Sequence, residues 1–183
     1  MTITHPMKCS CCSDLLHGRF DRRNFMKIVG GAGLAAAFPM ISFGATGNYE
    51  AMVLSCIDPR FPEHTLNYMR SRGMVGKYSQ FVVAGAAIGV VAPSFKDWHK
   101  TFWDNLEASI QLHSIPKVIA IDHRDCGAAR IAYGEARVAD PKVETETHRA
   151  ALMEFRAQVK ERQPKLEIET GLMNIDGQVE MFA

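Results

Sequence analysis

The chain has 183 residues, of which 47% are hydrophobic and 22% charged, and its formal net charge is +1. This length and composition match an ordinary globular protein of one domain, and they exclude the collagen-like, low-complexity and disordered classes. A net charge this small indicates no polybasic surface for nucleic acid, and no stretch reaches the roughly 20 apolar residues that a membrane-spanning helix needs.

Residues 1–44 carry a net charge of +3, whereas residues 45–183 carry −2. In the first segment, adjacent Arg22 and Arg23 precede a short apolar stretch that is rich in glycine and alanine and ends at Ser42-Phe43-Gly44. This order is typical of a secretory signal, and the paired arginines resemble a twin-arginine signal. We therefore expect cleavage after this site and export to the periplasm, with no stable membrane insertion afterwards. The alternative is an N-terminal helix of the folded domain, which the glycines would weaken.

Residues 45–183 are expected to form a single domain in which strands and helices alternate. Apolar runs typical of strands buried on both faces occupy residues 51–55, 80–84 and 117–121. Helix-compatible segments occupy residues 63–72, 98–113, 127–138 and 145–162. An alternating strand at 166–170 and an Asp-Gly turn at 176–177 between two apolar runs complete the chain. This alternation predicts an α/β fold with a central, mainly parallel sheet flanked by helices.

Polar residues follow the first predicted strand, at the sheet edge where α/β proteins place their chemistry. The segment reads Cys56-Ile57-Asp58-Pro59-Arg60. In an extended chain, residues i, i+2 and i+4 point to the same side, and proline favours extended geometry in the residue before it. Cys56, Asp58 and Arg60 are therefore expected to share one side, with a thiolate beside a carboxylate–guanidinium pair.

A histidine and a cysteine follow the third predicted strand, as His123-Arg124-Asp125-Cys126-Gly127. The spacing lets His123 and Cys126 reach one metal ion, and Cys56 would add a second thiolate. Two thiolates and one imidazole form a three-ligand zinc set with an open fourth position, which is typical of a catalytic site. None of the other histidines of this domain has evident ligand spacing: His64, His99, His113 and His148.

Two other interpretations of these cysteines stay open. A cysteine at the end of a buried strand is often a small core residue. In an exported protein, Cys56 and Cys126 can also form a disulfide or a redox pair. The remaining cysteines lie in the predicted signal and receive no role: Cys9, Cys11 and Cys12.

The motifs Cys-x-Asp-x-Arg at 56–60 and His-x-x-Cys-Gly at 123–127 resemble the β-carbonic anhydrase family, and the resemblance extends over residues 50–183. It implies zinc on Cys56, His123 and Cys126. It also implies association into a homodimer or a higher homo-oligomer. The implied activity is the reversible hydration of carbon dioxide to bicarbonate by zinc-bound hydroxide. In that mechanism Asp58, oriented by Arg60, accepts the hydrogen of the hydroxide and aims it at carbon.

The residues between the two ligands of the second motif, Arg124 and Asp125, have two interpretations. They can tune the site or shuttle protons, or they can form a solvated pair on the surface.

The sequence departs from the family pattern at two places. Where the family usually has Arg-Asn-Ala-Gly after the second strand, this chain has the stretch Ala84–Gly89, and Asp122 stands where the family usually has glycine. The substrate is therefore less firmly implied than the fold. The alternatives are a hydrolase of carbonyl sulfide or carbon disulfide, and a zinc-binding homologue without turnover. The apolar residues at 84–92 are expected to lie in a subunit contact.

Overall fold

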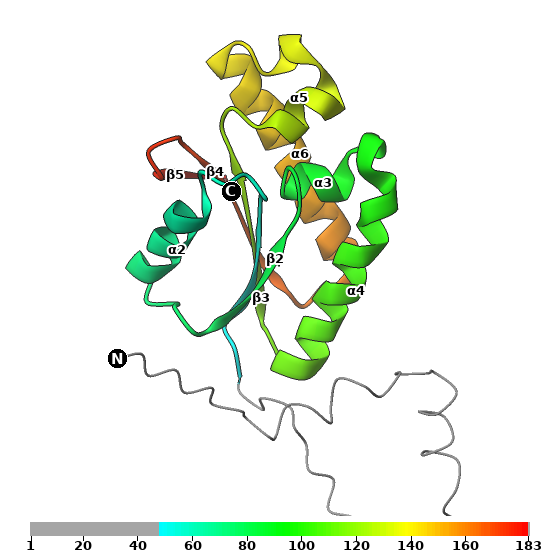
Figure 1. Cartoon of the computed structure of the whole chain (residues 1–183). Coiled ribbons are helices and arrows are strands. Elements are labelled where there is room, and N and C mark those ends of the chain that lie inside the picture. The colour runs from blue at the N-terminus through cyan, green and yellow to red at the C-terminus, as the bar shows by residue number, and fades with distance from the viewer. Residues whose placement is uncertain (1–47, 183) are drawn as a thin grey trace, which may run out of the picture. The chain divides into compact units, whose positions relative to one another are not determined.

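The computed structural model describes residues 48–182. A five-stranded sheet forms the centre of this unit (Figure 1), and its strands run in the order β2 (Tyr78–Val82), β1 (Ala51–Ser55), β3 (Lys117–His123), β4 (Glu167–Met173) and β5 (Val179–Phe182). The first four strands pair in parallel, and β5 is antiparallel to β4. The predicted α/β fold with a mainly parallel sheet is confirmed.

Helices cover both faces of the sheet (Figure 1). One face carries α2 (Pro62–Ser71), and the other carries α3 (Ala87–Val91), α4 (Lys96–His113) and α6 (Pro141–Arg162). The helix α5 (Gly127–Tyr133) lies beyond the carboxyl edge of the sheet, and two short 3₁₀ helices span Pro93–Phe95 and Glu135–Arg137. None of the helices in the described range is both long and apolar enough to span a membrane.

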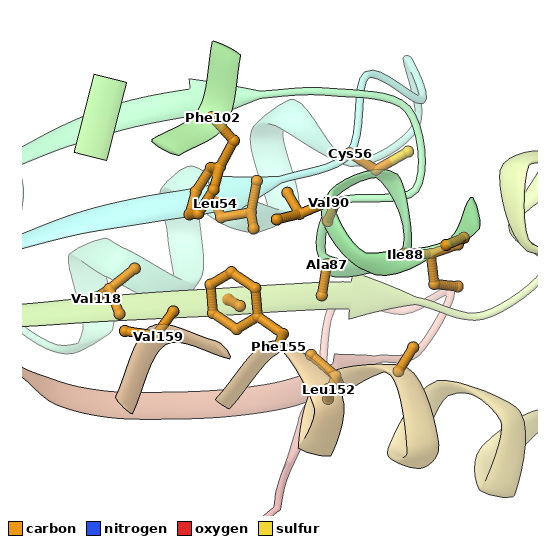
Figure 2. Packing of buried hydrophobic residues seen from close by; sticks show 14 of the residues in the cluster. Leu54, Cys56, Ala87, Ile88, Val90, Phe102, Val118, Leu152, Phe155 and Val159 are labelled. Carbon is orange, nitrogen blue, oxygen red and sulfur yellow. The ribbon is translucent and has the colours of Figure 1, made fainter. Parts of the chain in front are cut away.

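The strand β1 is buried along its whole length and contributes to two cores. Met52 and Leu54 point into the larger core, which the helices α3, α4 and α6 close (Figure 2), whereas Ala51 and Val53 point into the smaller core beneath α2. Successive side chains of a strand face opposite sides, so an apolar run without alternation needs cover on both faces. This is the physical reason why β1 lies inside the sheet.

The long helix α6 begins four residues before the predicted start. Asp140 caps it, because the Asp140 Oδ1 atom accepts hydrogen bonds from the backbone N–H groups of Lys142 at 2.9 Å and Val143 at 3.1 Å. Pro141 occupies the first turn, where its missing N–H does no harm.

Four other element predictions need correction. The second strand lies at 78–82 rather than 80–84, and it is only half-buried because it forms one edge of the sheet. The third strand extends to His123, so Cys126 does not end a strand but precedes α5. The predicted helix 127–138 divides at Gly134 into α5 and a 3₁₀ turn. The short helix α3 was not predicted.

Candidate metal centre

Three buried side chains meet at the carboxyl edge of the sheet. Cys56 follows β1, His123 is the last residue of β3, and Cys126 precedes the first turn of α5. One possible ligand atom from each of them lies within 4.8 Å of those of the other two. The three residues are no more than 8% exposed. This separation lets one ion reach all three donors.

The sheet topology explains this meeting. The strands β1 and β3 are adjacent and parallel, with Leu54 opposite Ala120, so both end at the same edge. The chain then turns sharply after His123, and Asp125 takes a positive φ of 55°. This turn brings Cys126 back toward His123.

The tautomer of His123 suits a metal ligand. Its Nδ1 atom donates a hydrogen bond to the backbone carbonyl of Arg124 at 2.8 Å, because a carbonyl can only accept. The Nε2 atom therefore carries a free electron pair, and it is buried without any hydrogen-bond partner in the protein. Phe61 stacks on the imidazole with a ring-centroid distance of 4.0 Å and fixes its plane. Buried polar atoms are nearly always satisfied, so an unpaired Nε2 aimed at two sulfurs fits a metal ion.

The pKa values of the two thiols move in opposite directions. The hydrogen bond from Cys126 is the largest cause that lowers the pKa of Cys56, to about 4, against the effect of burial. The hydrogen bond to Cys56 and burial both raise the pKa of Cys126. The backbone N–H of Gly85 also donates to the Cys56 sulfur, at 3.2 Å. These shifts favour the thiolate at Cys56, and a metal held by both sulfurs would displace the remaining proton.

Arg60 joins two carboxylates beside the sulfurs. Its Nε and Nη2 atoms donate to the two carboxylate oxygens of Asp58 at 3.0 and 2.7 Å, and its Nη1 atom donates to Asp125 Oδ2 at 2.7 Å. The Nη2 atom also donates to the Asp125 carbonyl at 3.0 Å. The hydrogen bonds from Arg60 lower the pKa of Asp58 to about 2, although burial opposes them. Asp58 is therefore ionised near neutral pH.

Asp58 and Arg60 meet through a turn rather than through an extended segment. The chain turns at Pro59 and Arg60. The backbone N–H of Arg60 donates to Asp58 Oδ1 at 3.0 Å, and the N–H of Phe61 donates to the Asp58 carbonyl at 3.1 Å. The predicted extended geometry over residues 56–60 was therefore wrong, although the carboxylate–guanidinium pair forms.

A buried glutamate that the sequence analysis missed supports the turn between the two ligands. Glu144, on α6, is 5% exposed. Its Oε1 accepts from the backbone N–H of Asp125 at 2.6 Å, and its Oε2 accepts from Arg124 Nη1 at 3.2 Å. Arg124 and Asp125 thus bond to other residues rather than to each other: Arg124 is half-buried and pairs with Glu144, whereas Asp125 is exposed and pairs with Arg60. No local sequence signal marks Glu144, because its partners lie about twenty positions earlier in the chain.

The remaining sequence predictions are placed as follows. Cys56 and Cys126 are free thiols in the structure, so the disulfide interpretation receives no support. Within residues 48–182, the group that could hold a metal contains neither Asp58 nor any histidine other than His123. The predicted signal and the three cysteines within it lie outside the described residues.

Comparisons with known proteins show the family of this chain. A family model described as "Putative carbonic anhydrase" matches residues 46–183. Uncharacterized proteins of Rickettsia conorii and Rickettsia bellii are each 33% identical over 133 residues, which cover 73% of this chain and 72% and 81% of theirs.

Solved structures share the fold. The crystal structure of a carbonic anhydrase from Streptococcus mutans has a TM-score of 0.51 at 16% identity, over 88% of this chain and 92% of that one. The Coccomyxa β-carbonic anhydrase, solved in complex with acetazolamide, has a TM-score of 0.52 at 16% identity, over 75% of this chain and 73% of that one. With the family model matching nearly the whole described unit, the chain belongs to this family of carbonic anhydrase enzymes.

Proposed function

We propose that the protein is a zinc-dependent carbonate dehydratase that interconverts carbon dioxide and bicarbonate. The observation that carries this proposal is the buried cluster of Cys56, His123 and Cys126, in which His123 Nε2 has no protein partner. Two thiolates and one imidazole are donors that zinc prefers, and three protein ligands leave one position open. Membership of the carbonic anhydrase family supports the choice of reaction.

The residues of the site divide the work of the reaction. Zinc with one open position lowers the pKa of the water it binds and so supplies a nucleophile near neutral pH. The ionised Asp58 can accept the hydrogen of that nucleophile and so direct its lone pair toward carbon. In the balanced reaction, carbon gains a bond to the oxygen of water, and one proton leaves to solvent as bicarbonate forms.

Arg60 has a second task in this mechanism, because it keeps Asp58 off the metal position. Three of its nitrogen–oxygen contacts engage the Asp58 carboxylate and the Asp125 side chain at 2.7 to 3.0 Å. A bidentate guanidinium–carboxylate pair is strong and directional. Asp58 therefore stays a hydrogen-bond acceptor held by Arg60, and it would leave the fourth position of a metal on Cys56, His123 and Cys126 to water.

The test measures zinc content and carbon dioxide hydration on the same preparations. The purified protein is expected to hold about one zinc per chain and to hydrate carbon dioxide in a stopped-flow assay. Asp58→Asn keeps the size of the side chain but loses its charge, so turnover should fall about a hundred- to a thousand-fold with zinc retained. Asp104→Asn is the matched control, because Asp104 pairs only with Lys100 on the surface of α4. A zinc-free, folded and active wild type would refute the proposal.

A second candidate reaction is the hydrolysis of carbonyl sulfide or carbon disulfide. It is favoured by the stretch Ala84–Gly89, which carries no polar side chain where the family usually has arginine and asparagine. If the wild type binds zinc but does not hydrate carbon dioxide, these two sulfur compounds are the next substrates to assay.

A homodimer is the third part of the proposal, but its contact is not expected at residues 84–92, because most of that stretch is buried within the chain itself. The strand β2 is an edge strand, and an apolar cavity of about 450 Å³ lies beside it. Three of the residues that line the cavity are exposed large hydrophobics: Ile57, Val82 and Trp98. An edge strand beside exposed apolar residues is a surface on which a second copy of the chain can pack. Light scattering at micromolar concentration should give at least twice the chain mass. Val82→Lys should give a monomer. A monomeric wild type with full activity would contradict the homodimer.

Export to the periplasm by the twin-arginine route is the last part. That system carries folded proteins, so zinc could be inserted before the thiols meet an oxidising compartment. Replacing both Arg22 and Arg23 by lysine is expected to abolish periplasmic accumulation in a fractionation experiment. Unchanged accumulation would remove the signal assignment and leave the zinc site untouched.

A further inference from the structure

We propose that Asp122 and His148 are positioning residues that hold the loop Gly85–Ala87 against the Cys56 sulfur. We call this segment the 85–87 loop. The proposal rests on the proposed function insofar as Cys56 is taken as a zinc ligand. It assigns a role to a buried polar pair that the mechanism does not otherwise use.

Three hydrogen bonds connect the pair to the sulfur. His148 Nδ1 donates to Asp122 Oδ2 at 2.9 Å, and the backbone N–H of Ala87 donates to Asp122 Oδ1 at 2.9 Å. Two residues earlier, the backbone N–H of Gly85 donates to Cys56 Sγ at 3.2 Å. The connection thus runs from α6 through β3 to the 85–87 loop, and from the loop to the first thiolate.

The pair is fully enclosed. Asp122 is 1% exposed and His148 is 0% exposed. A buried carboxylate is unfavourable unless its oxygens are hydrogen-bonded, and here each oxygen has one partner. His148 Nε2 is buried without a partner. In the tautomer with its hydrogen on Nδ1, this atom is an unpaired acceptor, and the only N–H group of the ring is hydrogen-bonded to Asp122.

The 85–87 loop needs to be held, because its backbone is strained. Gly85 has a φ of +80°, and a Cβ atom there would lie 3.0 Å from the Cβ of Ala128. Ala86 has a φ of +47°, which is unfavourable for a residue with a side chain. Strained backbone persists only where the surroundings over-determine it. The Asp122 carboxylate supplies one such constraint directly after the strained Ala86.

The position of the loop matters for the metal site because an N–H group on a thiolate withdraws electron density from sulfur. A metal bound by this sulfur then keeps more positive charge, which favours ionisation of bound water. The two departures from the family pattern noted in the sequence, Asp122 and the stretch 84–89, are also bonded to each other through Ala87. We therefore treat them as one device.

The experiment uses cobalt as the metal probe on the full chain, because the sulfur-to-cobalt absorption band reports on the thiolate. The test variants are Asp122→Gly and His148→Leu, which remove the pair, and His148→Asn, which keeps a donor near the Nδ1 position. The matched control is Thr170→Val: Thr170 is 1% exposed and its hydroxyl bonds to Phe182 and Arg156, away from the 85–87 loop.

Asp122→Gly and His148→Leu are expected to shift the sulfur-to-cobalt band and to raise the dissociation constant for cobalt about tenfold or more. Hydrogen exchange in the metal-free protein should accelerate at the amides of Gly85 and Ala87. His148→Asn should restore most of the band position, and Thr170→Val should leave band and exchange unchanged. If Asp122→Gly does not fold, His148→Leu decides.

A wild-type band and wild-type exchange in His148→Leu and in the folded Asp122 variant would overturn the positioning role. Failure of the proposed function looks different. If the wild type binds cobalt but does not hydrate carbon dioxide, the proposed function is wrong. The positioning role still stands in that case, provided that the variants shift the band. If the wild type binds no metal, the exchange rates at Gly85 and Ala87 alone decide, and unchanged rates refute the role.

Discussion

Two polar clusters lie on this sheet, and they differ in how completely their atoms are satisfied. Near the amino ends of β3 and β4, Glu169 lies between Arg72 at 2.7 Å and Lys117 at 2.5 Å. We call this the Glu169 cluster. At the carboxyl edge, Arg60 likewise lies between two carboxylates, but His123 Nε2 beside them has no partner.

This difference separates a structural cluster from a binding site. In the Glu169 cluster each charge meets an opposite charge, so the group is complete within the protein. At the carboxyl edge, two buried sulfurs and a buried nitrogen converge on a position that no protein atom completes. Because unsatisfied buried polar atoms are rare, their convergence indicates a ligand. The predictions below test this contrast, from the largest effect to the smallest.

Loss of a proposed ligand should remove the metal and its contribution to stability together. With free zinc at about a thousand times its dissociation constant, binding to the folded state should raise the free energy of unfolding by about 4 kcal/mol. His123→Ala should abolish this increase and stoichiometric zinc binding. Thermal unfolding with and without zinc, together with metal analysis, measures both, and an unchanged zinc response in His123→Ala would exclude it as a ligand.

Loss of Arg60 should impair catalysis while zinc stays. Arg60→Ala releases Asp58 to approach the metal position, so turnover should fall about a hundred-fold or more and X-ray absorption should detect an additional oxygen ligand from protein. Arg60→Lys should recover only part of the rate, because an ammonium group cannot hold a carboxylate through two parallel hydrogen bonds. Wild-type turnover in both variants would make the pair purely structural.

The pKa of Asp58 offers a direct measure of its pairing. In the zinc-free protein its carboxyl carbon should titrate near pH 2, where Arg60 holds its pKa. A group with a lowered folded pKa contributes stability above its unfolded pKa and loses that contribution as the pH falls toward the folded value. In Arg60→Ala the carbon-13 NMR titration should move up toward the ordinary value of 3.8, and an unmoved midpoint would show that another group holds the carboxylate.

The Glu169 cluster should give the smallest effect, and on stability alone. Burial by itself would raise the pKa of Glu169, but the hydrogen bonds from Arg72 and Lys117 outweigh it and lower the pKa. Its contribution is therefore present above pH 4.5, the ordinary value, and is lost as the pH falls through the folded pKa. Glu169→Gln should lower the free energy of unfolding at pH 7 by about 1 kcal/mol and flatten its decline in acid.

Urea unfolding between pH 3 and 7 measures this change. Zinc content and turnover of Glu169→Gln should equal those of the wild type, because the cluster lies away from the carboxyl edge. A loss of zinc in this variant would erase the contrast between the two clusters.

Local patterns in the sequence were sufficient for much of the fold. The apolar run at 51–55 has no alternation, and burial on both faces is the only way to remove all of its side chains from water. The pairing of Asp58 with Arg60 was predicted as well, although from an extended segment rather than from the turn that forms it. The single domain at 45–183 and the signal before it remain predictions from composition and motif.

Other features depend on which segments become neighbours. Cys56 and His123 lie together because β1 and β3 are neighbours in the sheet. In the sequence, the edge strand β2 comes between these two strands. The half-burial of β2 has the same origin, since an edge strand has one neighbour whatever its own composition.

The buried polar residues that bond to the loops of the site could not be predicted from the sequence, for a related reason. Glu144 bonds to a turn 19 residues earlier, and His148 bonds to Asp122 26 residues earlier. The helix α3 begins after a residue with positive φ, a conformation that alanine disfavours locally. Sequence alone determined most of the segments that become strands and helices, because that choice follows local periodicity. Only the tertiary structure decided which buried polar groups meet, because desolvation makes those partners necessary only after the segments have packed.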